Sequence, residues 1–200
     1  MNIPFALGAW LEIEPEWLPP PDADRLLAAL REELPWEQRE IVLYGKRIMQ
    51  PRLIAWGGEL GYRYSGQTLE PRPLSPHLLP VMEAVQQRTH VPFNHVLVNR
   101  YRDGLDSMGF HADDEAELGE NPLVATVSLG ATRRFVLRPR RGRDLEPLAY
   151  DLEHGSLLIM GGTCQRQYHH GIPRQPSVRE ERMSLTFRWL RAEPGGEKSS

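Results

Sequence analysis

The 200-residue chain predicts a mainly β fold with supporting helices, an α+β class. Two observations lead to it. Short segments of alternating apolar and polar residues follow one another in the second half, with turns between them, which is typical of a sandwich or barrel. Two segments with apolar residues at helical spacing precede them. Hydrophobic residues make up 40% of the chain, and no interdomain linker is visible, so we expect one domain over residues 1–190.

Two helices are expected, and both are interpreted as packing elements. The first begins with a cap from Asp22 or Asp24 and ends at Leu34, because Pro35 follows. The second opens at Ser75 and carries an apolar stripe at helical spacing.

Seven strands are then expected in quick succession. Their predicted ranges are 94–101, 123–129, 134–138, 148–152, 156–160, 168–172 and 182–190. The polar tail, 191–200, is expected to be disordered.

His111 and Asp113 form the first chemical motif. Side chains two residues apart in an extended chain point to the same face. Two imidazoles and a carboxylate can hold one face of a ferrous ion and leave positions open for O2 and a co-substrate. Alone, the pair could equally belong to an acidic surface loop. His169 and His170 are adjacent candidates for the third ligand, and only one of them can face the metal in a strand. We choose His170.

The segment 182–188 alternates between polar and apolar residues. Arg182, Ser184, Thr186 and Arg188 share one face of the predicted strand, and apolar residues share the other. Buried arginines need anionic partners, and a guanidinium matches a carboxylate in bidentate fashion. The two arginines therefore suit a small dicarboxylate. Without the upstream ligands, the same pattern would indicate solvated arginines on an exposed strand.

Asn99 and Tyr101 share a face of the predicted strand 94–101. Either could donate a hydrogen bond to the same organic acid, or could be an ordinary polar residue of a strand. Taken with the ligand and arginine motifs, they indicate a non-haem Fe(II) oxygenase that consumes 2-oxoglutarate.

The order and spacing of these motifs resemble the AlkB family of DNA and RNA dealkylases, over about residues 42–190. The matching motifs are Asn99-Arg100-Tyr101, His111-Ala112-Asp113, Ser128-Leu129-Gly130, Gly161-Gly162, His170-Gly171-Ile172 and Arg182-x-x-Leu185-Thr186-Phe187-Arg188. The resemblance implies a double-stranded β-helix, or jelly roll, with a core at about 94–190, N-terminal helices and a nucleotide-recognition lid at about 40–70. It implies Fe(II) at His111, Asp113 and His170, and 2-oxoglutarate at Asn99, Tyr101, Arg182, Thr186 and Arg188.

The resemblance extends to the lid, where Trp56 and the segment around Tyr64 match lid strands. It implies that Tyr64 stacks on the damaged base opposite His111. Tyr62 would meet the base edge, and Asp114 would form a hydrogen bond to it. Lesions such as 1-methyladenine are cationic near neutral pH, and an aromatic box with a carboxylate favours a cation.

A short turn at Tyr44 resembles a hairpin that some members insert into duplex DNA. Tyr44 would be the wedge that fills the gap left by the flipped base, and a plain hairpin turn is an equal alternative. Arg52 could steady the backbone nearby. The base must leave the stack, at a cost of roughly a few kcal/mol.

The charge distribution is more informative than the net charge of −3. Six arginines fall within one predicted strand and the following turn: Arg133, Arg134, Arg138, Arg140, Arg141 and Arg143. Such a patch can hold phosphates without sequence preference. A solvated hairpin would have the same composition.

The sequence therefore predicts an Fe(II)- and 2-oxoglutarate-dependent DNA dealkylase that releases formaldehyde, succinate and CO2. One alternative is an oxygenase of the same fold that acts on RNA, a protein or a small molecule; another is a non-catalytic jelly roll. The single Cys164 excludes an internal disulfide and fits a reducing cytosol. With no leader-like start and no membrane-length apolar run, we expect a cytoplasmic monomer whose partner is alkylated DNA.

Overall fold

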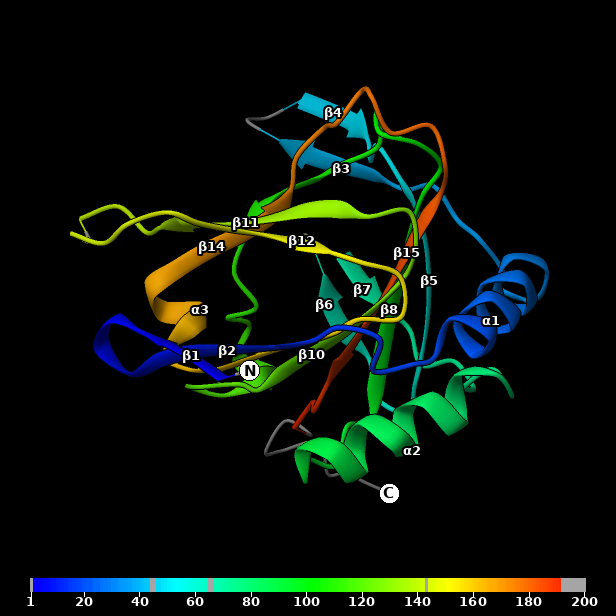
Figure 1. Cartoon of the computed structure of the whole chain (residues 1–200), viewed down its shortest axis with the longest axis horizontal. Helices are drawn as coiled ribbons and strands as arrows, with labels where there is room; N and C mark the ends of the chain where they lie inside the picture. The colour runs from blue at the N-terminus through cyan, green and yellow to red at the C-terminus, as the bar shows by residue number, and fades with distance from the viewer. Residues whose placement is uncertain (1, 44–45, 65–66, 143, 192–200) are drawn as a thin grey trace, which may run out of the picture.

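A computed structural model describes residues 2–43, 46–64, 67–142 and 144–191. Two antiparallel sheets face each other at its centre (Figure 1). The first has seven strands in the order β1-β2-β13-β10-β15-β8-β5, and the second has four in the order β12-β11-β14-β9. The mainly β sandwich is the fold class that the sequence predicts.

The larger sheet consists of β1 (Asn2–Phe5), β2 (Ala9–Glu14), β5 (Leu53–Gly58), β8 (His95–Tyr101), β10 (Val124–Gly130), β13 (Leu157–Gly162) and β15 (Arg182–Arg188). The smaller sheet consists of β9 (Met108–His111), β11 (Arg133–Pro139), β12 (Leu148–Leu152) and β14 (Tyr168–Ile172). All seven predicted strands are present, with ends that differ by at most two residues. β1, β2 and β9 were not predicted, although β2 alternates apolar and polar residues as the other strands do.

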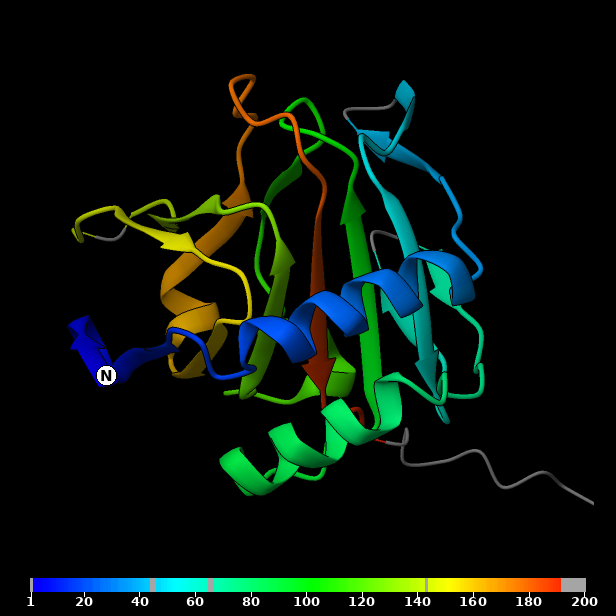
Figure 2. The ribbon, with the colours of Figure 1, turned by 45° about the vertical axis from the view of Figure 1, so that its right-hand side comes forward.

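Two helices, α1 (Pro20–Glu33) and α2 (Leu78–Thr89), cover the outer face of the larger sheet (Figure 2). Both contribute apolar residues to the core against that face. The predicted cap of α1 is wrong: the helix begins at Pro20, and no side chain caps it. Proline suits a first helical position because its φ is already helical and its missing N–H needs no partner there. α2 begins at Leu78, after a turn in which the Ser75 carbonyl accepts two backbone hydrogen bonds.

The alternation predicted for β8 and β15 is confirmed by burial. Val96, Val98, Leu185 and Phe187 are fully buried in the core between the larger sheet and the helices. Their polar neighbours point to the opposite face, toward the smaller sheet. The predicted apolar face ends earlier than expected, because Trp189 lies beyond β15 and is 41% exposed.

Two hairpins stand apart from the main sheets. They are formed by β3 (Glu40–Leu43) with β4 (Lys46–Met49), and by β6 (Tyr62–Tyr64) with β7 (Gln67–Leu69). β5, which carries Trp56, runs between the hairpins in sequence but belongs to the larger sheet. Short helical segments complete the fold: η1 (Ala6–Gly8), η2 (Ala116–Leu118) and α3 (Cys164–Gln167). Among the described residues, no helix has the length and apolar character needed to cross a membrane.

Candidate metal centre

Three side chains converge on one point: two come from strands of the smaller sheet, and one comes from the loop after β9. The ligand atoms of His111, Asp113 and His170 all lie within 4.8 Å of one another. β14 pairs with β9 so that His170 lies opposite His111, and their ring centroids are 4.4 Å apart. His169 lies opposite Arg138 on β11 and is absent from the cluster. The alternation of β14 thus selects the histidine that we chose from the sequence.

Neighbouring groups orient each ligand. The Nδ1 of His111 donates to the Gly109 carbonyl at 2.9 Å, which leaves Nε2 toward the other ligands. The Oδ1 of Asp113 accepts a 2.7 Å hydrogen bond from Arg188, and its backbone N–H donates to Gln165. The His111 Nε2 and the Asp113 Oδ2 are buried and have no hydrogen-bond partner among the described residues. Two unpartnered ligand atoms that face each other fit a divalent cation such as Fe(II).

Electrostatics favour the metal-binding protonation states. Burial lowers the pKa of His111 and lowers that of His170 to about 3. Burial alone would raise the pKa of Asp113, but Arg188 and the two histidines outweigh it and lower that pKa to about 2. Neutral imidazoles and an ionised carboxylate are the forms that bind metal.

A cavity between the two sheets opens onto these ligands. The larger sheet contributes its polar wall: Asn99, Tyr101, Thr126, Arg182, Ser184, Thr186 and Arg188. The smaller sheet contributes mainly apolar groups, Met108, Phe135, Leu152 and Ile172, and Met160 of β13 in the larger sheet adds another. All five residues that the sequence assigned to 2-oxoglutarate therefore line the same cavity as the histidines.

The two arginines of β15 are in different states. The Arg182 side chain is 1% exposed and donates to the Ser128 hydroxyl at 2.8 Å. Its Nε and Nη1 have no hydrogen-bond partner, and it forms no ion pair, among the described residues. Burial lowers its pKa to about 10. Arg188, by contrast, is paired with Asp113. A buried cation without a counter-ion is costly, so Arg182 marks a place for an anionic ligand.

Comparison with known proteins assigns the family. Residues 11–188 match the model of the 2OG-Fe(II) oxygenase superfamily. The alpha-ketoglutarate-dependent dioxygenase alkB homolog 3 of Rattus norvegicus is 41% identical over 186 residues, which cover 88% of this chain and 62% of that protein. The DNA oxidative demethylase ALKBH2 of Mus musculus is 38% identical over 178 residues, which cover 84% of this chain and 74% of that protein. This chain belongs to the AlkB family of 2OG-Fe(II) oxygenases. It spans less than two thirds of the alkB homolog 3 relatives.

Solved structures agree on the fold. A structure described as that of OsALKBH1 superposes with a TM-score of 0.63 at 18% identity, and covers 89% of this chain and 97% of that one. A 2OG-Fe(II) oxygenase family protein from Burkholderia pseudomallei superposes with a TM-score of 0.58 at 18% identity, and covers 91% of this chain and 85% of that one. The mainly β jelly roll is therefore the shared architecture.

The cofactors of an AlkB-family oxygenase fit the residues present. The His111, Asp113 and His170 set offers two imidazole nitrogens and a carboxylate, which is the ligand set of non-haem Fe(II) oxygenases. The free donors of Arg182 fit a carboxylate of 2-oxoglutarate. One cavity thus has ligand atoms without partners that fit iron, and arginine donors without partners that fit 2-oxoglutarate, among the described residues.

Three of the residues predicted to meet the substrate, Arg52, Trp56 and Tyr62, are buried in internal contacts, and Tyr62 packs against His95. Trp56 is 4% exposed, donates to the Glu70 carbonyl at 2.8 Å, and has the Arg72 guanidinium 3.6 Å from its ring centroid. It does not line the cavity, because its ring packs in a separate apolar cluster with Tyr62, Leu69 and Leu97. Arg52 is equally buried and donates to Asn99.

The carboxylate beside Tyr62 is Glu115, whereas Asp114, which was predicted to form a hydrogen bond to the base, lies nearer the surface. Asp114 is half exposed and forms an ion pair with Arg140 at 2.8 Å. Glu115 is turned inward instead. Burial, and then the charge of Asp113, raise the pKa of Glu115 to about 7, although a hydrogen bond with Tyr62 acts to lower it. In a run of acidic residues, no local signal shows which one turns inward. Tyr44 and the Tyr64 side chain lie outside the described residues.

The predicted basic patch is smaller than the sequence suggests. Arg133 is buried and donates to the carbonyls of Asp103, Asp106 and Pro173, so it does not contribute to a surface. Arg134 pairs with Asp151.

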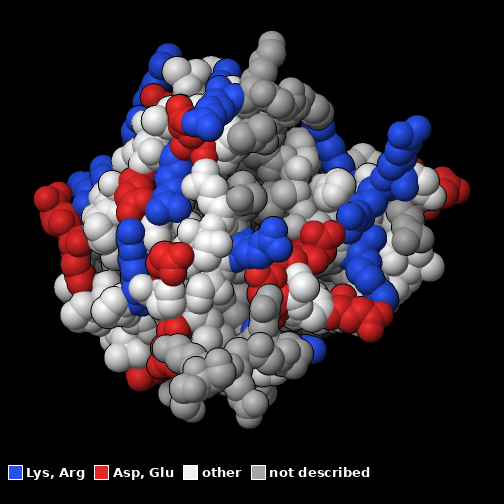
Figure 3. Space-filling model, turned by 180° about the vertical axis from the view of Figure 1, so that it is seen from behind, with Lys and Arg blue, Asp and Glu red and all other residues white. Residues whose placement is uncertain are grey.

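Three arginines remain toward the β11–β12 turn, and Arg143 lies outside the described residues. Arg138 and Arg141 are exposed, and Arg140 is partly exposed. Basic side chains gather on the side of the molecule where this hairpin projects, beside acidic groups (Figure 3).

A larger hollow, about 920 Å³, lies on the outer face of the larger sheet beside α1. Most of its charged groups already form pairs: Arg31 and Arg100 with Glu181, His154 with Asp24, and Arg102 with Asp106. The described ligand cluster lies on the opposite side of that sheet, so this hollow is separate from the metal centre.

Proposed function

We propose that this protein is an Fe(II)- and 2-oxoglutarate-dependent dioxygenase that repairs DNA by oxidative demethylation of N-alkylated bases. The observation that carries the proposal is the single cavity that joins an unpaired, buried Arg182 to the His111, Asp113 and His170 cluster. Two of the relatives, an alpha-ketoglutarate-dependent dioxygenase and a DNA oxidative demethylase, support the same activity.

The polar wall of the cavity would hold the co-substrate. Arg182 offers two free donors to one carboxylate, and Tyr101 lies beside it, with the Arg182 guanidinium 5.3 Å from its ring centroid. Asn99 and Thr186 lie on the same wall. Arg188 holds Asp113 and has one donor, Nη1, without a partner among the described residues. The apolar wall keeps water away from the reacting groups.

Bound Fe(II) supplies the oxidising chemistry, in which O2 and 2-oxoglutarate are consumed to give succinate and CO2. The protein contributes the fixed ligands and the orientation of the two substrates. Oxidation of an N-methyl group gives a hydroxymethyl group that leaves as formaldehyde and restores the base.

The two hairpins, β3–β4 and β6–β7, are proposed as the lid over the alkylated base. Tyr62 and Glu115 would meet the base edge, and Tyr64 would stack on its face. Methylation at a ring nitrogen of adenine or cytosine makes the base cationic, and an inward carboxylate beside an aromatic ring favours a cation. Glu115 therefore takes the role that the sequence assigned to Asp114.

Arg138, Arg140 and Arg141 are proposed to contact phosphates of the bound strand, with Tyr44 as the wedge in duplex DNA. The net charge of −3 limits non-specific attraction, so a local basic hairpin would provide the electrostatic grip. A monomeric state and a cytoplasmic location stay predictions.

The test is incubation with Fe(II), 2-oxoglutarate, ascorbate and a DNA oligomer that carries one 1-methyladenine, followed by mass measurement of the oligomer. Loss of one methyl group that depends on 2-oxoglutarate is expected. The His170→Ala variant should be inactive and the His169→Ala variant active, because only His170 belongs to the ligand cluster.

Succinate formation without loss of the methyl group would contradict DNA as the substrate and direct the search to RNA, proteins or small molecules. No succinate from a folded, iron-loaded protein would contradict the dioxygenase activity itself.

A further inference from the structure

Arg52 lies at the junction between the β3–β4 hairpin and β5, and its side chain reaches across to β8. It is 3% exposed. The Nε atom donates to the Asn99 Oδ1 at 2.8 Å. β5 pairs with β8 so that Ile54 lies opposite Asn99, which places the Arg52 side chain beside the Asn99 amide rather than at the surface.

This hydrogen bond fixes which end of the Asn99 amide faces the cavity. An asparagine amide carries one acceptor oxygen and one donor NH2 group. Because the oxygen accepts from Arg52, the Nδ2 donor is directed away from the guanidinium. Asn99 lines the cavity that also contains Arg182. In the reverse orientation the amide oxygen would face the cavity and would repel a carboxylate there.

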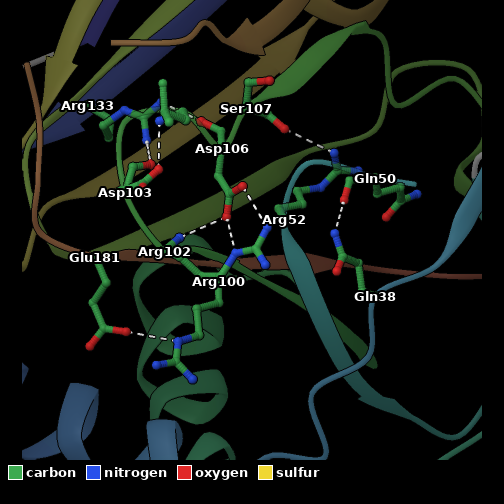
Figure 4. Close-up of polar contacts among 11 residues, drawn as sticks. Gln38, Gln50, Arg52, Arg100, Arg102, Asp103, Asp106, Ser107, Arg133 and Glu181 are labelled. Carbon is green, nitrogen blue, oxygen red and sulfur yellow. Dashed lines mark hydrogen bonds and ion pairs between the residues drawn. The ribbon is translucent and has the colours of Figure 1, made fainter. Parts of the chain in front are cut away.

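Arg52 makes a second hydrogen bond, to Ser107 (Figure 4). Its Nη1 donates to the Ser107 carbonyl at 3.2 Å, and the Ser107 N–H donates to the Pro51 carbonyl at 2.9 Å. Ser107 directly precedes β9, the strand that ends at His111. On the other side, the Gln50 carbonyl accepts from the Gln38 side chain. Arg52 is therefore fixed by backbone groups before any ligand binds.

We propose that Arg52 is a positioning residue that orients the Asn99 amide so that its NH2 group donates to a carboxylate of 2-oxoglutarate. This rests on the proposed function, because 2-oxoglutarate is taken as the anion of the cavity. It replaces the role near the nucleic-acid backbone that the sequence suggested for Arg52, since the buried guanidinium is occupied inside the protein.

The test measures 2-oxoglutarate affinity directly, by calorimetry on the Fe(II)-loaded protein without O2. Arg52→Met removes the donor and keeps an apolar stem of similar length. We expect binding of 2-oxoglutarate weaker by on the order of tenfold to a hundredfold, because one hydrogen bond to a charged group is lost. In turnover, the KM for 2-oxoglutarate should rise with a smaller change in kcat, and the KM for the methylated oligomer should stay constant.

A double-mutant cycle separates an action through Asn99 from a general structural effect. If Arg52 acts through Asn99, the Arg52→Met/Asn99→Ala double variant binds 2-oxoglutarate no more weakly than Asn99→Ala alone. Arg100→Met is the matched control, because Arg100 is next to Asn99 in sequence. The Arg100 side chain lies on the opposite face of β8, where it pairs with Glu181. This substitution should leave the affinity unchanged. Arg52→Leu, which also removes the donor, provides a second variant if Arg52→Met does not fold.

Unchanged 2-oxoglutarate affinity in either folded Arg52 variant, or additive losses in the cycle, would overturn the proposal. A rise confined to the KM for the oligomer would do the same and would return Arg52 to a nucleic-acid contact. If the unmodified, iron-loaded protein bound no 2-oxoglutarate, the proposed function would fail as well, which is a different result from binding that is insensitive to Arg52.

Discussion

Arg182 and Arg188 show how two identical side chains on one strand face acquire different properties. Both are fully buried, and both line the cavity. Arg188 has Asp113 as its counter-ion, whereas Arg182 has a hydroxyl and the ring of Tyr101 but no carboxylate among the described residues. Removing one partner of a buried ion pair costs about 3–5 kcal/mol, and removing an uncompensated buried cation does not.

The two arginines should therefore respond in opposite ways to the same substitution. Arg188→Met should lower the unfolding free energy of the metal-free protein by about 3–5 kcal/mol, because Asp113 loses its partner. Arg182→Met should leave it unchanged or raise it, while 2-oxoglutarate affinity falls at least tenfold. Urea denaturation and calorimetry measure the two quantities. Equal destabilisation by both substitutions would contradict the assignment of Arg182 as an anion site.

His95 is a buried titratable group that the proposed reaction does not use. Its ring packs edge-on against Tyr62, with centroids 5.0 Å apart, and both ring nitrogens lack a hydrogen-bond partner among the described residues. Burial, and then the charge of Arg188, lower its pKa from 6.5 to about 3. The unfolded chain therefore binds one more proton than the native chain between these two values.

The sign of the pH dependence follows from this depressed pKa. The contribution of neutral His95 to stability is complete above pH 6.5 and is lost as the pH falls toward 3, at about 1.4 kcal/mol per pH unit. Between pH 7 and pH 5, the unmodified protein should lose about 2 kcal/mol more unfolding free energy than His95→Leu. Urea denaturation of both proteins, with a metal chelator present, measures this difference. If the unfolding free energies of the two proteins depended on pH in the same way, His95 would not contribute.

At the scale of elements, strand alternation decides which side chains enter the cavity, and hydrogen bonds to loops hold the strands in place. Alternation along β14 directs His170 into the cavity and leaves His169 outside the ligand cluster. Arg133, at the start of β11, holds the loop after β8 and the loop after β14 through their backbone carbonyls. These loops flank the strands that carry His111 and His170, so β11 helps to fix the distance between the two histidines.

The β11–β12 hairpin should determine how strongly nucleic-acid binding depends on salt. Substituting Arg138, Arg140 and Arg141 together by alanine should reduce the slope of log Kd against log salt by about 0.7–0.9 for each phosphate that the protein no longer neutralises. Arg134→Ala serves as the control, because Arg134 lies at the start of β11, away from the β11–β12 turn, and pairs with Asp151. Titrations of a methylated oligomer over a range of salt concentrations give the slopes. An unchanged slope in the triple variant would place the phosphate-binding residues elsewhere.

At the scale of the whole molecule, the site is assembled across two sheets. The histidines come from the smaller sheet, and the polar wall with Asn99 and Arg182 comes from the larger one. Ligands held by both walls should therefore stabilise the sandwich as a unit. Binding to the native state alone adds stability in proportion to the logarithm of ligand concentration over Kd.

Fe(II) and 2-oxoglutarate together should raise the melting temperature without O2. For each ligand at a hundredfold excess over its own Kd, the added stability is about 2.7 kcal/mol, which corresponds to roughly 5–10 °C for a chain of this size. Calorimetric scans with and without a chelator measure the shift. His170→Ala should abolish the iron-dependent part, and a shift of equal size in that variant would contradict the assigned ligand set.

The sequence by itself determined the features that depend on local periodicity. Alternation assigned Asn99 and Tyr101 to one face of β8, and Arg182 and Arg188 to one face of β15. The same rule separated His170 from its neighbour. These predictions hold because side chains in a strand alternate whatever the strand packs against.

Only the tertiary structure decided which polar residues of loops and sheet edges turn inward. Glu115 rather than Asp114 is turned toward Tyr62, Arg133 holds loops instead of facing solvent, and Arg52 binds Asn99. Each outcome depends on partners distant in sequence, because a charged side chain is buried only where hydrogen-bond acceptors or counter-ions from other segments compensate its lost hydration.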